Sequence, residues 1–184
     1  EKMALSLLAH VAALGWTLGD LAFRRAQPAE APLIFSRLFR EKMNPIGVKP
    51  ERFVLAWDKP KGAVAGFGQI RPVGDGACEL ASLIVEPAYR GLGVGTVLVT
   101  KLLARHRISG DAGKPVYLIT LEQTSPFYER LGFGTANDPP SALKLEMAAG
   151  AIVAKLATGQ GLVCMQADEG AVADAEEGVQ NQMR

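Results

Sequence analysis

The chain alternates between two spacings of apolar residues, and this pattern predicts a fold that mixes helices with strands. Apolar residues three and four positions apart indicate helices, whereas short alternating or continuous apolar runs indicate strands. Helices are expected over 31–43, 96–107, 125–131 and 141–157, and strands over 20–26, 53–57, 63–71, 78–85, 116–120, from 133 onward and over 162–166. This order predicts an α/β layer fold with helices packed on a central sheet.

The two ends of the chain differ in pattern from its middle. Residues 1–19 are apolar with helical spacing, which predicts an amphipathic extension that packs on the domain or on a second copy of the chain, as in a homodimer. This stretch is shorter than a membrane span and lacks the basic start of a signal peptide. Residues 167–184 are acidic and free of aromatics, which predicts a disordered tail. One domain is therefore expected over 20–166.

Composition and charge narrow the class of protein. A chain of 184 residues with 48% hydrophobic and 21% charged residues can bury one ordinary core. Its formal net charge of +1 gives no reason to expect a nucleic acid or an anionic membrane as a partner. We expect a cytoplasmic protein, or one of an organelle stroma or matrix if a targeting segment has been removed.

The cysteines and histidines do not form a metal-binding pattern. Cys78 and Cys164 stand far apart among apolar residues, which predicts two reduced, buried thiols rather than a disulfide. His10 and His106 lie on different segments, and no cluster has the spacing of zinc ligands. We therefore expect no metal.

A glycine-rich loop between a predicted strand and a predicted helix is the main candidate for chemistry. Residues 90–95 read Arg-Gly-Leu-Gly-Val-Gly. Glycines leave backbone amides uncovered, and amides at the start of a helix bind phosphate readily. Arg90 adds a fixed positive charge with a forked set of donors. The alternative is a glycine-rich turn that only reverses the chain.

Two familiar nucleotide motifs fail at this loop. Residues 91–96 miss the third glycine of the dinucleotide fingerprint, and no acidic residue follows at the end of a second strand to hold a ribose. The Gly-Lys-Ser/Thr triplet of a P-loop is also missing after the loop. The loop suits a pyrophosphate, but neither an NAD nor a GTP site is supported.

Residues 79–95, ELASLIVEPAYRGLGVG, resemble the signature of the GNAT acyl-CoA N-acyltransferases. The shared features are an apolar strand, a Pro-x-Tyr-Arg approach and the pattern Arg-x-x-Gly-x-Gly. A second motif of the family, FYERLGF, follows over residues 127–133. The resemblance covers roughly residues 21–166 and implies the GNAT fold, a mixed, mostly antiparallel central sheet with flanking helices.

The resemblance also implies acetyl-CoA as cosubstrate and a set of residues that bind it. The backbone of Leu83, Ile84 and Val85 would bind the pantetheine arm. The pyrophosphate would lie against the loop, whose residues are Arg90, Gly91, Leu92, Gly93, Val94, Gly95 and Thr96. No metal takes part in the implied chemistry.

Acyl transfer to an amine needs a proton acceptor for the amine and a proton donor for the departing thiolate. Tyr128 matches the tyrosine that often protonates the thiolate in this family; alternatively, it only packs against the sulfur or bonds to it. Glu79 lies six residues before Val85, where some protein-lysine acetylating members carry a base, and is our first candidate. The alternatives are a solvated or ion-paired Glu79, Glu122 as the base, or bulk water. Glu86, at the loop, is expected to face solvent.

Two features depart from the family pattern. Leu121 occupies the position, seven residues before the tyrosine, where the family often has an asparagine that touches the cofactor arm. That contact is either lost or made by Gln123 or Thr124. The helix expected over 141–157 lies between the last two strands, where it either shapes the acceptor site or packs on the sheet.

The expected function is that of an N-acetyltransferase. It would transfer an acetyl group from acetyl-CoA to a primary amine, which could be a protein N-terminus, a lysine or a small amine, by direct attack in a ternary complex. The main alternative is a non-catalytic acyl-CoA-binding sensor or scaffold module. A nucleotide-binding regulator is a third hypothesis, against which the missing NAD and GTP residues count.

Overall fold

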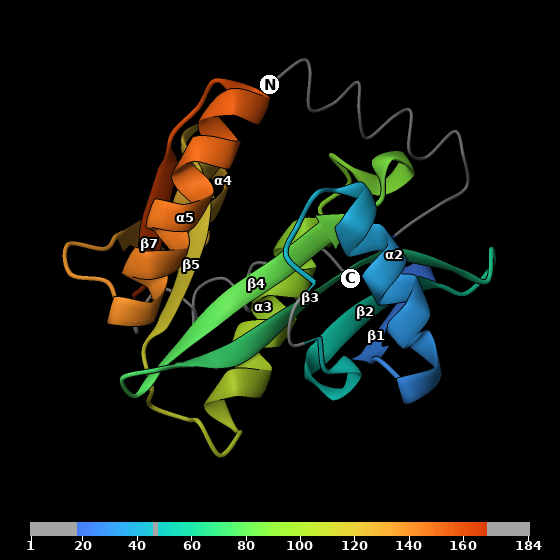
Figure 1. Cartoon of the computed structure of the whole chain (residues 1–184). Helices are drawn as coiled ribbons and strands as arrows, with labels where there is room; N and C mark the ends of the chain where they lie inside the picture. Colours follow the sequence, from blue (N-terminus) through green and yellow to red (C-terminus); the bar gives the residue numbers. More distant parts are fainter. Residues whose placement is uncertain (1–17, 46–47, 169–184) are drawn as a thin grey trace.

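The computed structural model describes residues 18–45 and 48–168, which form a central sheet flanked by helices (Figure 1). The strands are β1 (Leu21–Arg25), β2 (Phe53–Asp58), β3 (Ala63–Gly74), β4 (Ala77–Val85), β5 (Val116–Leu121), β6 (Phe133–Thr135) and β7 (Leu162–Ala167). The helices are α2 (Ala31–Arg40), α3 (Val94–Arg107), α4 (Ser125–Glu129) and α5 (Ser141–Thr158). The order of the seven strands is β1-β2-β3-β4-β5-β7-β6. Every neighbouring pair is antiparallel except β4 and β5, which confirms the predicted mixed, mostly antiparallel sheet.

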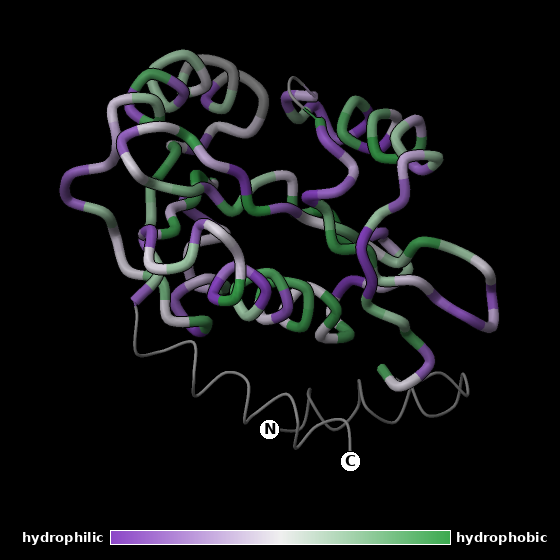
Figure 2. Tube along the Cα trace, turned by 90° about the horizontal axis from the view of Figure 1, so that it is seen from below, coloured by the Kyte–Doolittle hydropathy of each residue, from purple (hydrophilic) through white to green (hydrophobic). Residues whose placement is uncertain are grey.

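The helices cover the sheet from both faces. Helix α3 lies against one face, and α2 and α5 lie against the other, as the two views in Figures 1 and 2 show together. The alternation of strand side chains explains this arrangement, because neighbouring residues of a strand point to opposite faces. In β2, Val54 and Ala56 pack in the core with α3, whereas Phe53 and Leu55 pack in the core with α2.

Several predicted boundaries shift in the structure. Strand β3 continues to Gly74, past its expected end at 71, and α3 begins at Val94, two residues before the expected start. Ala167 was expected to open the tail but ends β7, and the amide of Asp168 donates to the carbonyl of Gly132 at 2.8 Å. The predicted extension over 1–19 lies outside the described residues except for its end, which enters a short 3-10 turn over Leu18–Asp20. The rest of the predicted tail, 169–184, lies outside them too.

Two further expectations concern buried sulfur and membranes. Cys78 and Cys164 are buried free thiols, as predicted. Within residues 18–45 and 48–168, no helix combines the length and apolar character that crossing a bilayer requires.

The parallel strands β4 and β5 pair only briefly and then separate. Their paired residues are Cys78 with Val116 and Glu79 with Tyr117. Strand β5 continues to pair with β7 on its other side as far as Leu121. Along its opposite edge, β4 pairs with β3, and a β-bulge interrupts the register of this pair. Ser82 in the bulge has a left-handed φ of 58°. The separation opens the sheet at its centre.

A buried carboxylate fixes the turn after β2 to the segment before the glycine loop. Asp58 is fully buried and accepts hydrogen bonds from the Tyr89 hydroxyl at 2.7 Å and from the Lys61 amide at 3.0 Å. Burial acts to raise the pKa of Asp58, but these hydrogen bonds and the charge of Lys61 outweigh it, so that the pKa lies below its usual value. Tyr89 thereby anchors the backbone immediately before Arg90.

We expect Tyr89→Phe to lower the free energy of unfolding by about 1–3 kcal/mol, because it removes one donor from a buried carboxylate. A carboxyl group whose pKa is depressed on folding stabilises the fold above its unfolded pKa and loses that contribution as the pH falls. The difference between wild type and variant should therefore shrink in acid. Urea denaturation over a range of pH measures both effects.

Tyr117→Phe is the matched control, because Tyr117 is also buried but its hydroxyl makes no hydrogen bond to a described residue. Equal losses of stability in the two variants would contradict the role given to the bond between Tyr89 and Asp58.

Candidate active site

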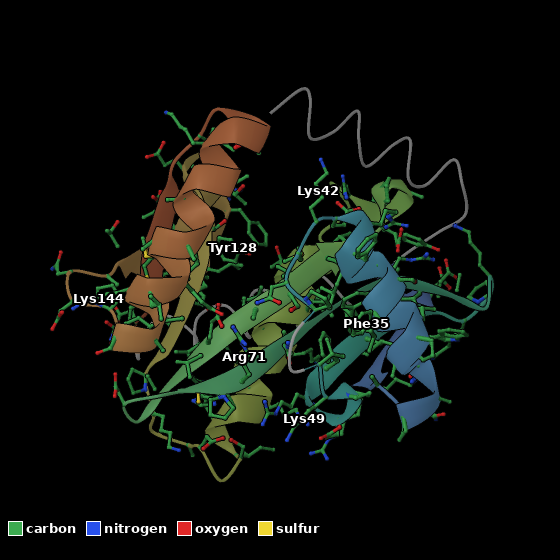
Figure 3. All side chains as sticks on the ribbon, in the orientation of Figure 1. Phe35, Lys42, Lys49, Arg71, Tyr128 and Lys144 are labelled. Carbon is green, nitrogen blue, oxygen red and sulfur yellow. The ribbon has the colours of Figure 1, made fainter. Side chains whose placement is uncertain are left out.

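Two cavities meet where β4 and β5 separate. The smaller, of about 430 Å³, lies over the glycine loop and the start of α3. The larger, of about 670 Å³, lies over the middle of β4 and is bordered by β5, α5 and the residues that follow α2. Leu83, Thr124 and Tyr128 border both. A molecule that occupies the smaller cavity can therefore reach the larger one past Tyr128, which Figure 3 labels beside α5, next to the gap toward β4.

The glycine loop presents backbone amides to the smaller cavity. Gly91 and Gly93 have φ angles of 78° and 81°, which residues with side chains rarely adopt. Helix α3 begins directly after Gly93, and the amide of Val97 bonds back to the Gly93 carbonyl at 3.2 Å. The amides at 94–96 thus have no partner within the helix and line the cavity. They form a site suited to an anion such as a phosphate.

The third glycine of the loop, Gly95, packs closely against α4. A Cβ atom on Gly95 would lie 3.3 Å from the Phe127 ring and 3.6 Å from Val85. A side chain here would therefore require the Phe127 ring to shift by a few tenths of an ångström. This contact places the anion site directly beside Tyr128.

The residues predicted to bind the cofactor do not all face this cavity. Arg90 lines it, donates from Nε to the Val85 carbonyl at 2.9 Å and pairs with Glu41 at 3.5 Å. Leu83 and Val85 also line it. The side chain of Ile84 is buried in the core with α2, and Leu92 packs against the core with α3. Any role of those two residues toward a ligand would have to come from their backbone.

Tyr128 is held by aromatic neighbours. Its ring meets those of Phe127 and Phe133 edge to face, with centroid distances of 4.8 and 5.9 Å. The side chain is 8% exposed, and burial raises the pKa of Tyr128 to about 12. Its hydroxyl is therefore protonated at neutral pH. This hydroxyl makes no hydrogen bond to a described residue. It is available as a donor at the junction of the two cavities.

Glu79 lies on the wall of the larger cavity and is 5% exposed. It accepts a hydrogen bond from Arg71 Nε at 2.7 Å, and Arg71 Nη2 also donates to Glu146 at 2.8 Å. Burial raises the pKa of Glu79, Arg71 opposes the rise and the nearby charge of Glu146 adds to it, so that the pKa lies above its usual value. A solvated Glu79 was one of the alternatives and is wrong; the ion-paired one is observed.

The other two glutamates of the sequence analysis do not line the larger cavity. Glu122 is exposed, and its carboxylate accepts a hydrogen bond from the Gly161 amide at 3.3 Å. The expectation that Glu86 faces solvent is wrong, since its side chain is only 14% exposed and pairs with Arg37 and Arg40 of α2. Helix α2 crosses the end of β4 and brings these arginines to it, which the sequence alone does not show.

Sequence reasoning missed the polar residues that complete the larger cavity, namely Gln69, Arg71 and Glu146. Arg71 is the direct neighbour of Glu79 across β3 and β4, but a strand register was needed to pair them. Gln69 Nε2 contacts Ser82 Oγ at 3.3 Å, while its buried Oε1 has no hydrogen-bond partner among the described residues.

The structure also shows where Leu121 and the two residues that could replace the missing asparagine lie. Leu121 lines the larger cavity, Thr124 borders both cavities, and Gln123 bonds through its amide to Gln160 at 3.2 Å. Of the two substitutes considered for the missing asparagine, Thr124 is the one positioned beside Tyr128. The described residues hold no cluster of three histidine, cysteine or carboxylate side chains that could bind a metal ion.

Comparison with known proteins agrees with this geometry. A family model described as an acetyltransferase (GNAT) domain matches residues 49–135. A curated mycothiol acetyltransferase from Mycolicibacterium gilvum (strain PYR-GCK) is 29% identical over 131 residues, which cover 67% of this chain and 37% of that protein. The chain thus corresponds to well under half of the length of this relative.

Solved structures share the fold at low sequence identity. Rv2747 from Mycobacterium tuberculosis, in complex with CoA and NLQ, has a TM-score of 0.59 and 22% identity, covering 79% of this chain and 98% of its own. N-acetylglutamate synthase from Neisseria gonorrhoeae, with CoA and N-acetyl-glutamate, has a TM-score of 0.60 and 16% identity, covering 81% and 35%. Escherichia coli ElaA has a TM-score of 0.56 and 17% identity, covering 80% and 99%.

Proposed function

The chain carries an acetyltransferase domain of the GNAT family, and we propose that it transfers an acetyl group from acetyl-CoA to a primary amine within a ternary complex. The observation that carries the proposal is the meeting of two cavities at Tyr128, one suited to an anion and the other lined by a buried carboxylate. Two substrates can then approach one point from two sides. The acceptor would be a protein N-terminus, a lysine or a small amine.

The smaller cavity would receive the donor. The amides at 94–96 and Arg90 would hold the pyrophosphate, and the pantetheine arm would run along Leu83 and Val85 toward the gap between β4 and β5. The CoA complexes of two structural relatives, Rv2747 and the N-acetylglutamate synthase, support this assignment. The thioester would then lie next to Tyr128.

Glu79 would act on the acceptor amine. An ammonium must lose a proton before its nitrogen can attack, and a buried carboxylate with a raised pKa is a better base than an exposed one. The neutral amine forms a bond to the thioester carbon, and the resulting tetrahedral intermediate collapses by breaking the bond between carbon and sulfur. The ammonium nitrogen loses two protons in all: Glu79 takes the first and passes it to solvent, and the second, lost after the attack, ends on the sulfur. The products are therefore the amide and CoA thiol.

Tyr128 would stabilise the departing sulfur. A phenol with a pKa of about 12 is a weaker acid than a thiol, whose pKa is about 8.5, so complete transfer of its proton to the thiolate is unfavourable at equilibrium. A hydrogen bond from the hydroxyl to the sulfur needs no such transfer and strengthens as charge develops. Of the roles that the sequence left open for Tyr128, this argument favours a bond to the sulfur over protonation of the thiolate.

A transfer assay with acetyl-CoA and a panel of amines and peptides, with products identified by mass, tests the proposal. Tight CoA binding without transfer to any acceptor would favour the non-catalytic sensor or scaffold instead. Dimerisation stays a prediction of the sequence.

Gly93→Glu is expected to weaken CoA binding by about a hundredfold or more, because it strains a left-handed backbone and places a negative charge against the pyrophosphate. Isothermal titration calorimetry with CoA measures the loss. Gly110→Glu is the matched control, since Gly110 has open space around it and lies outside both cavities. A folded Gly93→Glu variant that binds CoA as tightly as wild type would remove the loop from the donor site.

Tyr128→Phe should lower kcat by about a hundredfold while changing the KM for acetyl-CoA by no more than about twofold, because the hydroxyl acts mainly on the departing sulfur. Steady-state kinetics at saturating acceptor measure both constants. Unchanged turnover would leave Tyr128 with a packing role only.

Glu79→Gln should remove the acidic limb of the kcat profile that Glu79 sets. A base works only when ionised, so wild-type kcat should fall as the pH drops below the raised pKa of Glu79. Glu122→Gln is the control and should keep the wild-type profile. If Glu122→Gln rather than Glu79→Gln removed the limb, the base would have been assigned to the wrong residue.

A further inference from the structure

The wall of the larger cavity carries a half-buried group of three charged residues from three elements. Arg71 of β3 lies between Glu79 of β4 and Glu146 of α5, with hydrogen bonds of 2.7 Å to Glu79 and of 2.8 and 3.1 Å to the two oxygens of Glu146. The side chains of Arg71 and Glu79 are 23% and 7% exposed, and that of Glu146 is 39% exposed. We call these three residues the Arg71 triad.

The Arg71 triad has an excess of negative charge. One guanidinium faces two carboxylates, so with both glutamates ionised the group carries one net negative charge. Arg71 already directs its Nε and Nη2 donors at these carboxylates. A further carboxylate brought into the cavity would have to compete with them and would meet like charge at low dielectric.

The other cation on the cavity wall does not cancel this charge locally. Lys42 is exposed and lies just past the end of α2, on the far side of the cavity from α5 (Figure 3). Solvent screens an exposed ammonium far more than it screens the half-buried group around Arg71. The Arg71 triad therefore determines which ligand charge is favoured at this wall of the cavity.

A second, independent feature of the same cavity favours a ligand that carries a hydrogen-bond donor. Gln69 is 3% exposed and lines the cavity, and its Oε1 atom has no hydrogen-bond partner among the described residues. A buried carbonyl oxygen without a donor is unfavourable until a ligand supplies one. An N–H group of a bound molecule would satisfy it, whereas a carboxylate would not.

We infer that the larger cavity selects amine acceptors that carry a second positive or donor group and disfavours acceptors that carry a carboxylate. This inference rests on the proposed function and names the class of its acceptor. The second ammonium of such an acceptor would lie against Glu146 and Gln69, while the reacting nitrogen faces Glu79. Glu146 is then a specificity-determining residue contributed by the helix that departs from the short members of the family.

Three amines of equal chain length test the inference, because their reacting groups are alike and only the far end differs. Cadaverine carries a second ammonium, pentylamine a methyl group and ω-aminopentanoate a carboxylate. We expect wild-type kcat/KM to fall in that order, with cadaverine favoured over ω-aminopentanoate by at least about tenfold. Equal or reversed values for cadaverine and ω-aminopentanoate would overturn the inference.

The variant Glu146→Gln tests the origin of the preference. It neutralises the Arg71 triad, so the preference for cadaverine should fall by about tenfold while the KM for acetyl-CoA stays unchanged. Glu51→Gln removes the same charge from an exposed residue outside both cavities and should leave the preference intact. A preference that survives in Glu146→Gln would show that the triad does not set it.

Binding distinguishes failure of this inference from failure of the proposed function. If none of the amines is acetylated, the proposed function fails for this class, and calorimetry of the three amines with the CoA-loaded chain still ranks their affinities. The same order of binding supports the inference without turnover, and equal affinities or no binding overturn it.

Discussion

The separation of β4 from β5 is the constraint on which the rest of the site depends. Two parallel strands that pair over only two residues leave backbone groups without a strand partner in the middle of a sheet. Such groups are costly unless something else satisfies them. A ligand arm laid along Leu83 and Val85 would meet this need, so the proposed donor site coincides with the break in the ladder.

The neighbouring strands hold the gap open. Strand β5 is kept in place by five pairs with β7, and β4 by its long pairing with β3. The bulge at Ser82 bends β4 at the cost of a left-handed residue, on the order of 1–3 kcal/mol. Close packing supports the bend, since a Cβ on Gly66 would lie 2.6 Å from the Ile84 carbonyl. The sheet is therefore paired on both sides of an opening at its centre.

Ion pairs attach α2 and α5, the two helices that share one face of the sheet, to the two ends of β4. Arg71 connects Glu79, near the start of the strand, to Glu146 of α5, and Glu86, just past its end, pairs with Arg37 and Arg40 of α2. The helices that border the proposed acceptor cavity are thus fixed to the strand that would carry the donor. This connection relates the specificity proposed for Glu146 to the geometry of the donor site.

The sequence by itself determined the elements, the glycine loop and the position of Tyr128, because these follow from local spacing and from backbone freedom at Gly91 and Gly93. It could not determine that β7 lies between β5 and β6, nor that Arg71 lies beside Glu79, because strand order and register depend on contacts between distant segments. For the same reason it misplaced Glu86, whose partners come from α2. Only the tertiary structure decided which charges share the larger cavity, because that depends on how β3, β4 and α5 pack together.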